Sequence, residues 1–305
     1  MTRDTTSVRA GRRTVRIHRP AKVLFPDCGL TKADVADYYR RMAAFMVPQL
    51  RGRPLMLERH PDGVGGPRFM QKDTPDHYPR WVRRVTVDKE GGTVTHAVCD
   101  DSATLVFLAD QACLTFHRWL SRADRLRLPD RLVFDLDPPG EDFPAVREAA
   151  WRLGELLDQL GLPSALMTTG SKGLHVVLPL NGHTSFDEAR DFAKEVAHVL
   201  ADRRPDELTT AVRRKARGDR LYLNVQRNGY AQTAVAPWSI RPGPGAPVAA
   251  PVSWEQLEDK ELTARRWAVT DTDDVLAQAR GSPWSGLPAR GRALGPARRR
   301  LAALR

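Results

Sequence analysis

The chain has 305 residues, 41% of them hydrophobic, and a formal net charge of +11. This length and composition allow a substantial core, as one large domain or two closely associated ones. No run of about 18 apolar residues occurs, which disfavours a membrane span, and the N-terminus lacks the apolar segment of a secretory signal. The three cysteines are far apart and odd in number, which argues against a disulfide framework or a zinc site and favours a reducing cytoplasm.

The positive charge is concentrated at the two ends of the sequence. Residues 1–19 hold six arginines and one aspartate, and residues 280–305 hold seven arginines and no acidic residue. We therefore predict a basic N-terminal tail over 1–19, a folded domain over 20–279, and a basic, largely disordered C-terminal tail over 280–305. A polyanion would be bound by local clusters on the nearly neutral domain with help from the tails, whereas solvated tails on a neutral enzyme are the alternative.

The first half of the domain has the pattern of a helix followed by two hairpins. Thr31 is a candidate N-cap, and apolar residues recur at helical spacing from Val35 to Met46, which predicts a helix that ends before Pro48. The stretch RPLMLERHPDGVGGPRFMQK predicts one hairpin, and residues 82–99 predict a second. SATLVFLADQACLTFHRWL predicts a buried helix that leads into a strand.

From residue 131 onward the predicted order is strand, helix, strand, strand, helix. The strands are RLVFDLD, SALMTTG and LHVVLPL, and the helices are FPAVREAAWRLGELLDQLG and SFDEARDFAKEVAHVLADRR. RLYLNVQR and QTAVAPWSIR add two strands, and WEQLEDKEL has a helical pattern. The sum is an α+β protein whose central sheet carries the unusual polar residues.

The strand RLVFDLD ends with two carboxylates one residue apart. Because side chains alternate along a strand, Asp135 and Asp137 share one face, where two like charges are unfavourable unless a cation lies near them. Mg²⁺ and Mn²⁺ prefer hard oxygen ligands, and paired carboxylates serve such ions in nucleotidyl transfer. Strand-end aspartates also cap turns that precede prolines, so this motif alone leaves both interpretations open.

A second polar motif, TTGSKGLH, occupies residues 168–175. Its glycines permit a tight turn, while Thr169, Ser171 and Lys172 provide hydroxyls and an ammonium group for an anion. The spacing is not that of a Walker A loop. His175 opens the next strand, where an imidazole could reach a phosphate or a metal-bound water; an ordinary hairpin turn followed by an edge histidine is the alternative.

Together, VFDLDP, SKGLH and QTAVAPWSIR resemble the archaeo-eukaryotic primase superfamily, and most of all the polymerase domain of bacterial ligase D from non-homologous end joining. The resemblance extends through KVLFPDCGLTKADVADYY, RPLMLERHPDGVGGPRFMQK, DSATLVFLADQA and PGAPVAAPVSWEQL, and so covers roughly residues 20–275. It implies a primase-like α+β fold with a central, mostly antiparallel sheet flanked by helices. It also implies a primase-polymerase that fills gaps or extends DNA ends, incorporates ribonucleotides and uses a two-metal site with Mn²⁺ or Mg²⁺, Mn²⁺ preferred.

The resemblance assigns roles to matching positions. Asp135 and Asp137 would be catalytic metal ligands. Six residues would contact the incoming nucleotide: His117, Thr169, Ser171, Lys172, His175 and Arg241. Lys22 and Lys32 would hold the 5′-phosphate of the DNA, and Phe69 would stack on a template base. Taken singly, the two lysines read as surface residues and Phe69 as a core residue.

The chain departs from the superfamily at its third acidic position, which falls on Asn224 in RLYLNVQR. Alternation places Tyr222, Asn224 and Gln226 on one face, as a site residue requires. An amide offers a metal one oxygen but no negative charge, so activity is expected to be reduced. The alternative is a catalytically attenuated module that binds DNA ends and nucleotides.

The expected ligands are DNA ends or gapped DNA with a 5′-phosphate, together with NTP or dNTP. These residues contain no ligase or nuclease segment, so end joining would require a separate DNA ligase and the Ku end-binding protein. The expected location is the bacterial cytoplasm, in association with the nucleoid and not with a membrane.

Overall fold

The computed structural model describes residues 4–288 and 290–304. The chain divides into two compact units. The first extends to Trp119 and includes Val235–Ala250 and Trp267–Gly281, and the second consists of Leu120–Ala234, Pro251–Arg266 and the segment from Ser282 onward. No helix among the described residues is long and apolar enough to span a membrane.

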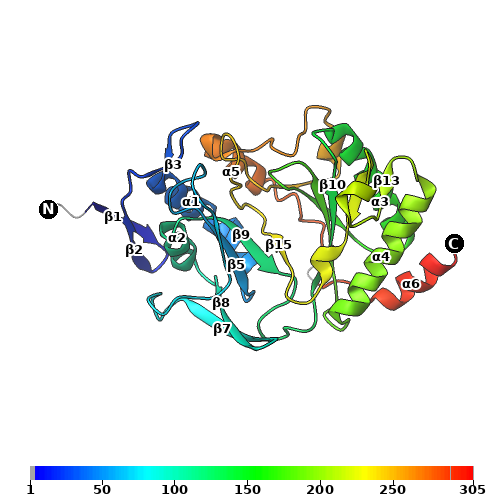
Figure 1. Cartoon of the computed structure of the whole chain (residues 1–305), viewed down its shortest axis with the longest axis horizontal. Helices are drawn as coiled ribbons and strands as arrows, with labels where there is room; N and C mark the ends of the chain where they lie inside the picture. The colour runs from blue at the N-terminus through cyan, green and yellow to red at the C-terminus, as the bar shows by residue number, and fades with distance from the viewer. Residues whose placement is uncertain (1–3, 289, 305) are drawn as a thin grey trace. The chain divides into compact units, whose positions relative to one another are not determined.

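The first unit combines short strand pairs with two helices that pack on each other, α1 and α2 (Figure 1). Its elements are β1 (Thr5–Ala10), β2 (Arg13–His18), β3 (Val23–Phe25), β4 (Leu30–Thr31), α1 (Lys32–Leu50), β5 (Leu55–Arg59), β6 (Phe69–Gln71), β7 (Arg83–Lys89), β8 (Gly92–Val98), α2 (Ser102–Asp110), β9 (Cys113–Trp119) and α5 (Thr272–Arg280). The pairings β5–β6 and β7–β8 confirm both predicted hairpins. A four-stranded sheet has the order β15-β9-β5-β6, with β15 at Thr233–Val235.

Helix α1 begins as its sequence predicts but ends later. Thr31 and Asp34 form a capping box at its start. The sequence predicts an end before Pro48, and this is wrong, because the helix continues to Leu50. Pro48 lies in the last turn, where its missing N–H removes one bond, and the amide of Arg51 still donates to the carbonyl of Val47 at 2.8 Å.

The N-terminal segment is a hairpin, not a tail, from Thr5 onward. β1 and β2 pair in antiparallel register along their full length. Val15 and Ile17 are buried, and β2 packs on α2. The abundance of arginine conceals this short alternating pattern, in which Val15 and Ile17 face the core while Arg9 and Arg16 face solvent.

The second unit is built on a six-stranded sheet in the order β13-β14-β10-β12-β11-β16. Every pairing in it is antiparallel except β13–β14, which confirms the predicted α+β fold with a mostly antiparallel central sheet. Helices α3 and α4 contact each other and the strands of the sheet (Figure 1). The elements are β10 (Arg131–Asp137), α3 (Phe143–Gln159), β11 (Ala165–Thr168), β12 (Leu174–Pro179), α4 (Phe186–Arg203), β13 (Leu208–Thr209), β14 (Leu221–Asn224), β16 (Pro251–Val252) and α6 (Leu294–Ala302).

The C-terminal segment is ordered where the structure describes it, so the predicted disorder over 280–305 is wrong for those residues. Helix α6 buries Leu294, Ala297 and Leu301, which recur at helical spacing. The Arg300 side chain donates to the carbonyl of Leu160 at 2.7 Å. The many arginines of this segment therefore belong partly to an amphipathic helix on the second unit.

The turn between β11 and β12 is held against β10 by a glycine. A side chain at Gly173 would place its Cβ 1.9 Å from the carbonyl oxygen of Leu136. Only glycine permits this approach of two backbones. The close contact fixes the polar loop beside the end of the strand that carries Asp135 and Asp137.

Replacing this glycine should therefore destabilise the second unit. We expect Gly173→Ala to lower the free energy of unfolding by about 1–3 kcal/mol, because the added methyl must displace one backbone. Thermal unfolding would measure the loss. Gly140→Ala is the matched control, since its Cβ would meet nothing within 4 Å; equal unfolding temperatures for the two variants would contradict the assigned packing.

Candidate active site

Asp135 lies in the middle of a three-strand polar row. β10 runs between β12 and β14, and the partners of Asp135 in register are His175 on β12 and Asn224 on β14. Asp137 follows on the same face of β10, opposite Tyr222. The sheet thus brings together four residues that the sequence predicts for the site.

The carboxylate of Asp135 has three nitrogen neighbours. His175 Nε2 lies 3.4 Å from Oδ1, while Arg227 Nε lies 3.4 Å and Asn224 Nδ2 lies 3.0 Å from Oδ2. Burial alone would raise the pKa of Asp135, but the charges and hydrogen bonds of His175 and Arg227 outweigh it and lower the pKa. Asp135 is therefore ionised at neutral pH.

The hydrogen bonds of Asn224 fix the orientation of its amide. The backbone N–H of Gln226 donates to Asn224 Oδ1 at 3.0 Å. An N–H group can only donate, so the oxygen must face Gln226 and the NH₂ group must face Asp135. Asn224 thereby acts as a hydrogen-bond donor to Asp135, and its oxygen is turned away from that carboxylate. Gln226 itself lies in a 3₁₀ turn, because the predicted strand ends at Asn224.

Asp137 is less well compensated than Asp135. Arg217 Nη1 lies 3.1 Å from its Oδ2, and the same guanidinium group stacks 3.8 Å from the centre of the Tyr222 ring. Burial and the negative charge of Asp135 together outweigh Arg217 and raise the pKa of Asp137. The two carboxylates therefore repel each other, as their spacing in the sequence indicates.

The loop beside these acids is folded by Thr169. Its hydroxyl accepts hydrogen bonds from the amides of Ser171 and Gly173, at 3.3 and 3.2 Å, and donates to the carbonyl of Gly173 at 3.0 Å. Ser171 and Lys172 remain partly exposed, with Lys172 Nζ 3.7 Å from Glu141. Thr169 thus shapes the turn, while Ser171 and Lys172 present their polar groups at its surface.

The imidazole of His175 is oriented by only one of its nitrogens. Nε2 faces Asp135, and the residue is 4% exposed. Within the described residues, Nδ1 is buried and has no hydrogen-bond partner. A buried unsatisfied polar atom is costly, and it marks a place where a bound group can supply the missing contact.

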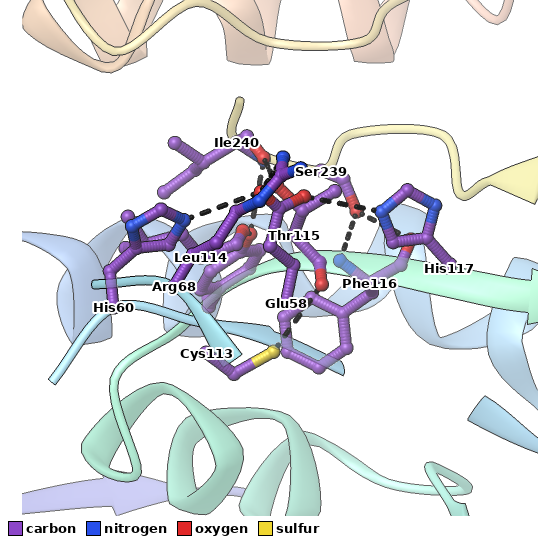
Figure 2. A network of polar contacts seen from close by, with 11 residues as sticks. Glu58, His60, Arg68, Cys113, Leu114, Thr115, Phe116, His117, Ser239 and Ile240 are labelled. Atoms are coloured by element: carbon purple, nitrogen blue, oxygen red, sulfur yellow. Dashed lines mark hydrogen bonds and ion pairs between the residues drawn. The ribbon is translucent and has the colours of Figure 1, made fainter. Parts of the chain in front are cut away.

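In the first unit, His117 belongs to a cluster around a buried glutamate that the sequence does not single out. Figure 2 shows Glu58 among His60, Arg68 and His117. Glu58 Oε1 lies 3.3 Å from His60 Nε2 and 3.7 Å from Arg68 Nη1, and Glu58 Oε2 lies 3.4 Å from His117 Nε2. Burial raises the pKa of Glu58, but hydrogen bonds to both histidines and the charges of His117 and Arg241 lower it well below its usual range. The charge of Glu58 is thus influenced by both His117 and Arg241, two of the residues that the resemblance assigns to the incoming nucleotide.

Lys22 and Lys32 line one cavity of about 220 Å³ in the first unit. Lys22 Nζ lies 2.8 Å from Asp62. Lys32 is 7% exposed, and its ammonium contacts Asp110 and donates to the carbonyl of His18, each at 2.8 Å. Lys32 is therefore not the ordinary surface lysine that its sequence context alone suggests.

Phe69 is also not the core residue that its hydrophobicity suggests. It is 53% exposed on β6, and its neighbour Met70 is 44% exposed. Because successive side chains of a strand point to opposite faces, Phe69 presents its ring on one face of β6, where it is available for stacking, and Met70 lies on the other.

Four residues that matter to these clusters escape prediction from the sequence: Glu58, Arg217, Arg227 and Asn228. Arg217 and Arg227 flank β14 and lie seven and three residues from Asn224. This closeness in sequence is the signal that could have indicated that they belong to the site. The buried side-chain amide of Asn228 pairs with both the N–H and the carbonyl of Val133, at 2.8 and 2.7 Å. It thereby ties the turn after β14 to β10.

The fold and the paired carboxylates define an α+β protein of the archaeo-eukaryotic primase class. The family model described as "LigD, primase-polymerase domain" matches residues 31–284. The polymerase domain of Mycobacterium tuberculosis Ligase D, solved in complex with DNA, superimposes with a TM-score of 0.83 at 32% identity, covering 91% of this chain and 99% of that one. The chain therefore belongs to the LigD primase-polymerase domain family.

Curated relatives agree with this assignment. The multifunctional non-homologous end joining protein LigD of Mycolicibacterium smegmatis is 35% identical over 86% of this chain and 34% of its own length. The corresponding protein of Pseudomonas aeruginosa is 30% identical over 91% of this chain and 33% of its own length. The chain thus spans about a third of the length of these relatives.

The glutamate cluster makes a prediction about pH. Glu58→Gln should lower the free energy of unfolding near pH 7 by about 3 kcal/mol, because it removes the buried carboxylate to which the imidazoles of His60 and His117 hydrogen-bond. The pKa of Glu58 is depressed in the folded protein, so its contribution is complete above the ordinary value of 4.5 and declines as the pH falls below that value. Urea unfolding near pH 7 and near pH 4 would measure the difference, which should be smaller in acid. An exposed control, Glu148→Gln, should have little effect at either pH, and a Glu58→Gln loss that grows in acid would contradict the assignment.

Proposed function

We propose that this protein is a template-directed nucleotidyltransferase, a DNA-dependent RNA/DNA primase-polymerase that fills gaps or extends ends in bacterial non-homologous end joining. The observation that carries the proposal is the polar row of His175, Asp135 and Asn224 across three adjacent strands, with Asp137 on the same face. The loop pinned by Gly173 lies beside this row. The DNA-bound polymerase domain from Mycobacterium tuberculosis, which this fold matches, supports the same reaction class.

The residues fit a divalent cation at Asp135 and Asp137. Both offer hard carboxylate oxygens on one face, and the pKa of Asp137 is raised partly by the charge of Asp135, a repulsion that a cation would relieve. No group of three His, Cys, Asp or Glu side chains suited to a metal occurs in residues 4–288 and 290–304. The proposed site would therefore lack a third acidic ligand, and Asn224 would stand at its position.

The reaction would join a primer 3′-hydroxyl to the α-phosphate of a nucleotide and release pyrophosphate. Bound Mn²⁺ or Mg²⁺ would lower the pKa of the attacking hydroxyl and neutralise charge on the phosphates. Asp135 and Asp137 would hold the cations, while Ser171 and Lys172 would bind phosphate oxygens. The free Nδ1 of His175 would complete its hydrogen bonds with the bound substrate.

Residues of the first unit would also bind nucleotide and DNA. His117, oriented by Glu58, and Arg241 would bind the triphosphate. The cavity of Lys22 and Lys32 would recognise a 5′-phosphate, which identifies a broken end and not a base sequence. Phe69 would stack on a template base.

A specific observation favours a second candidate, a catalytically attenuated module that binds DNA ends and nucleotides. Asn224 donates its NH₂ group to Asp135 and turns its oxygen to Gln226. In that orientation it supplies neither a charge nor an oxygen to a cation shared with Asp135. We therefore propose that the polymerase activity is reduced. In the second candidate, the reduction is so large that the protein mainly binds DNA ends and nucleotides.

In the cell, the polymerase domain would act in the cytoplasm, at DNA ends associated with the nucleoid. Ku and a DNA ligase would be the expected partners for completing repair. The chain spans only part of the length of its curated relatives, and two of those are named as multifunctional end-joining proteins.

Primer extension on gapped DNA with a 5′-phosphate, in Mn²⁺, tests the proposal. We expect Asn224→Asp to extend primers roughly 10²- to 10³-fold faster than the chain itself, since it restores a missing charge at the transition state. Asp137→Ala should abolish extension in either background.

The outcomes separate the two candidates. Slow extension by the chain and fast extension by Asn224→Asp would support an active polymerase with reduced rate. Extension by Asn224→Asp alone would support the binding module. No extension by either protein would defeat the polymerase proposal.

A further inference from the structure

The outer face of the β1–β2 hairpin carries basic and hydroxyl side chains only. The register pairs Thr5 with His18, Ser7 with Arg16, and Arg9 with Thr14, so these six residues share one face. All six are exposed. No residue of this face is acidic, although a carboxylate contacts it at one end, where Asp110 Oδ2 lies 2.9 Å from His18 Nδ1.

The opposite face fixes the hairpin to the first unit. Val15 and Ile17 are buried, and β2 packs against α2. Arg13 points to this inner side, with its guanidinium group 5.2 Å from the Trp81 ring centre and 3.5 Å from Asp101. The basic face is therefore presented by a rigid two-stranded platform.

Arg9 and Arg16 differ from those surface arginines that are held in ion pairs. Arg40 pairs with Asp37, and Arg190 pairs with Asp187, each within its own helix. Among the described residues, neither Arg9 nor Arg16 forms an ion pair. Their charges face solvent uncompensated, on a face that also offers hydroxyl donors.

The basic face leads directly into the lysine cavity. His18, the last residue of β2, and Arg19 both line the cavity that contains Lys22 and Lys32. Arg19 adopts a positive φ of 51°, and its amide donates to the carbonyl of Asp4 at 2.8 Å, which turns the chain from the hairpin toward that cavity. The basic face and the lysine cavity thus adjoin each other within the first unit, with the carboxylate of Asp110 between His18 and Lys32.

We propose that the outer face of the β1–β2 hairpin binds the phosphate backbone of the DNA duplex that continues from the 5′-phosphate held at Lys22 and Lys32. This inference rests on the proposed function. Arginine and hydroxyl groups are the usual donors to phosphate oxygens, and such contacts position a protein on DNA without reading its sequence. Arg9 and Arg16 are diagonal neighbours about 7–8 Å apart, and a six-residue strand spans about 20 Å, comparable to roughly six base pairs of duplex.

The test measures the salt dependence of binding to gapped DNA by fluorescence anisotropy. The DNA carries or lacks the 5′-phosphate, and its downstream duplex is either long or cut to a few base pairs. Arg9→Gln with Arg16→Gln should reduce the slope of log K against log salt by about 1–2 on the long duplex, since each phosphate contact contributes about 0.9. The same change should leave the short-duplex slope and the 5′-phosphate preference unaltered.

Three controls make the result specific. Arg9→Lys with Arg16→Lys keeps both charges and should keep the slope. Arg203→Gln with Arg299→Gln removes two exposed arginines from the second unit and should also keep it. Lys22→Ala with Lys32→Ala should remove the 5′-phosphate preference. Because all of the hairpin changes are at exposed positions, unfolding temperatures should stay close to that of the unchanged chain.

The failures can be told apart. An unchanged slope in the Gln pair, or an equal loss in the Arg203 and Arg299 control, would overturn the hairpin inference while leaving the DNA-end function standing. No binding of the unchanged chain to gapped DNA would overturn both. Hairpin-dependent binding to vesicles of anionic lipid without any effect on DNA would also overturn the inference.

Discussion

The charge of Asp135 is the constraint on which the second unit depends. A buried carboxylate is tolerated only if nitrogen donors surround it, and here the antiparallel sheet supplies one from each neighbouring strand, His175 and Asn224. Gly173 lets the next turn approach the same strand end, and Asn228 ties the turn after β14 to β10. The polar loop and the acids are therefore placed by backbone pairing and not by mobile side chains.

The same constraint explains why asparagine at position 224 does more than remove one negative charge. An aspartate at that position would repel Asp135 and would require a cation between them. The amide instead donates to Asp135, so a hydrogen bond stands at this position where two aspartates would repel each other. Arg227 and Arg217 each add a positive charge to one of the two carboxylates. The chain's own side chains thus compensate part of the negative charge that a cation would otherwise neutralise, which is the physical reason for expecting reduced catalysis.

The alternation and periodicity of apolar residues in the sequence predict the faces of strands and the positions of helices, because both depend only on residues close together in the chain. Alternation correctly predicts that Tyr222 and Asn224 share a face, and periodicity predicts the helices that flank the sheet. The sequence does not predict the environment of Glu58, because that depends on pairing between β5 and β9, far apart in the chain. It also conceals the ordered ends: dense arginine suggests tails, whereas Val15, Ile17 and Leu301 are sufficient to anchor a hairpin and a helix.

Direct titration of Mn²⁺, followed by electron paramagnetic resonance, tests the central claim most directly because it needs no turnover. The comparison is between the unchanged chain and Asn224→Asp, with Asp137→Ala as the control that should lose binding. Changes to residues that only support metal ligands typically alter metal affinity by roughly 10- to 100-fold. Because Asn224→Asp would add a direct ligand, we predict that it binds Mn²⁺ more tightly than the unchanged chain by at least that factor. Equal Mn²⁺ affinity and stoichiometry in the chain and in Asn224→Asp would contradict it.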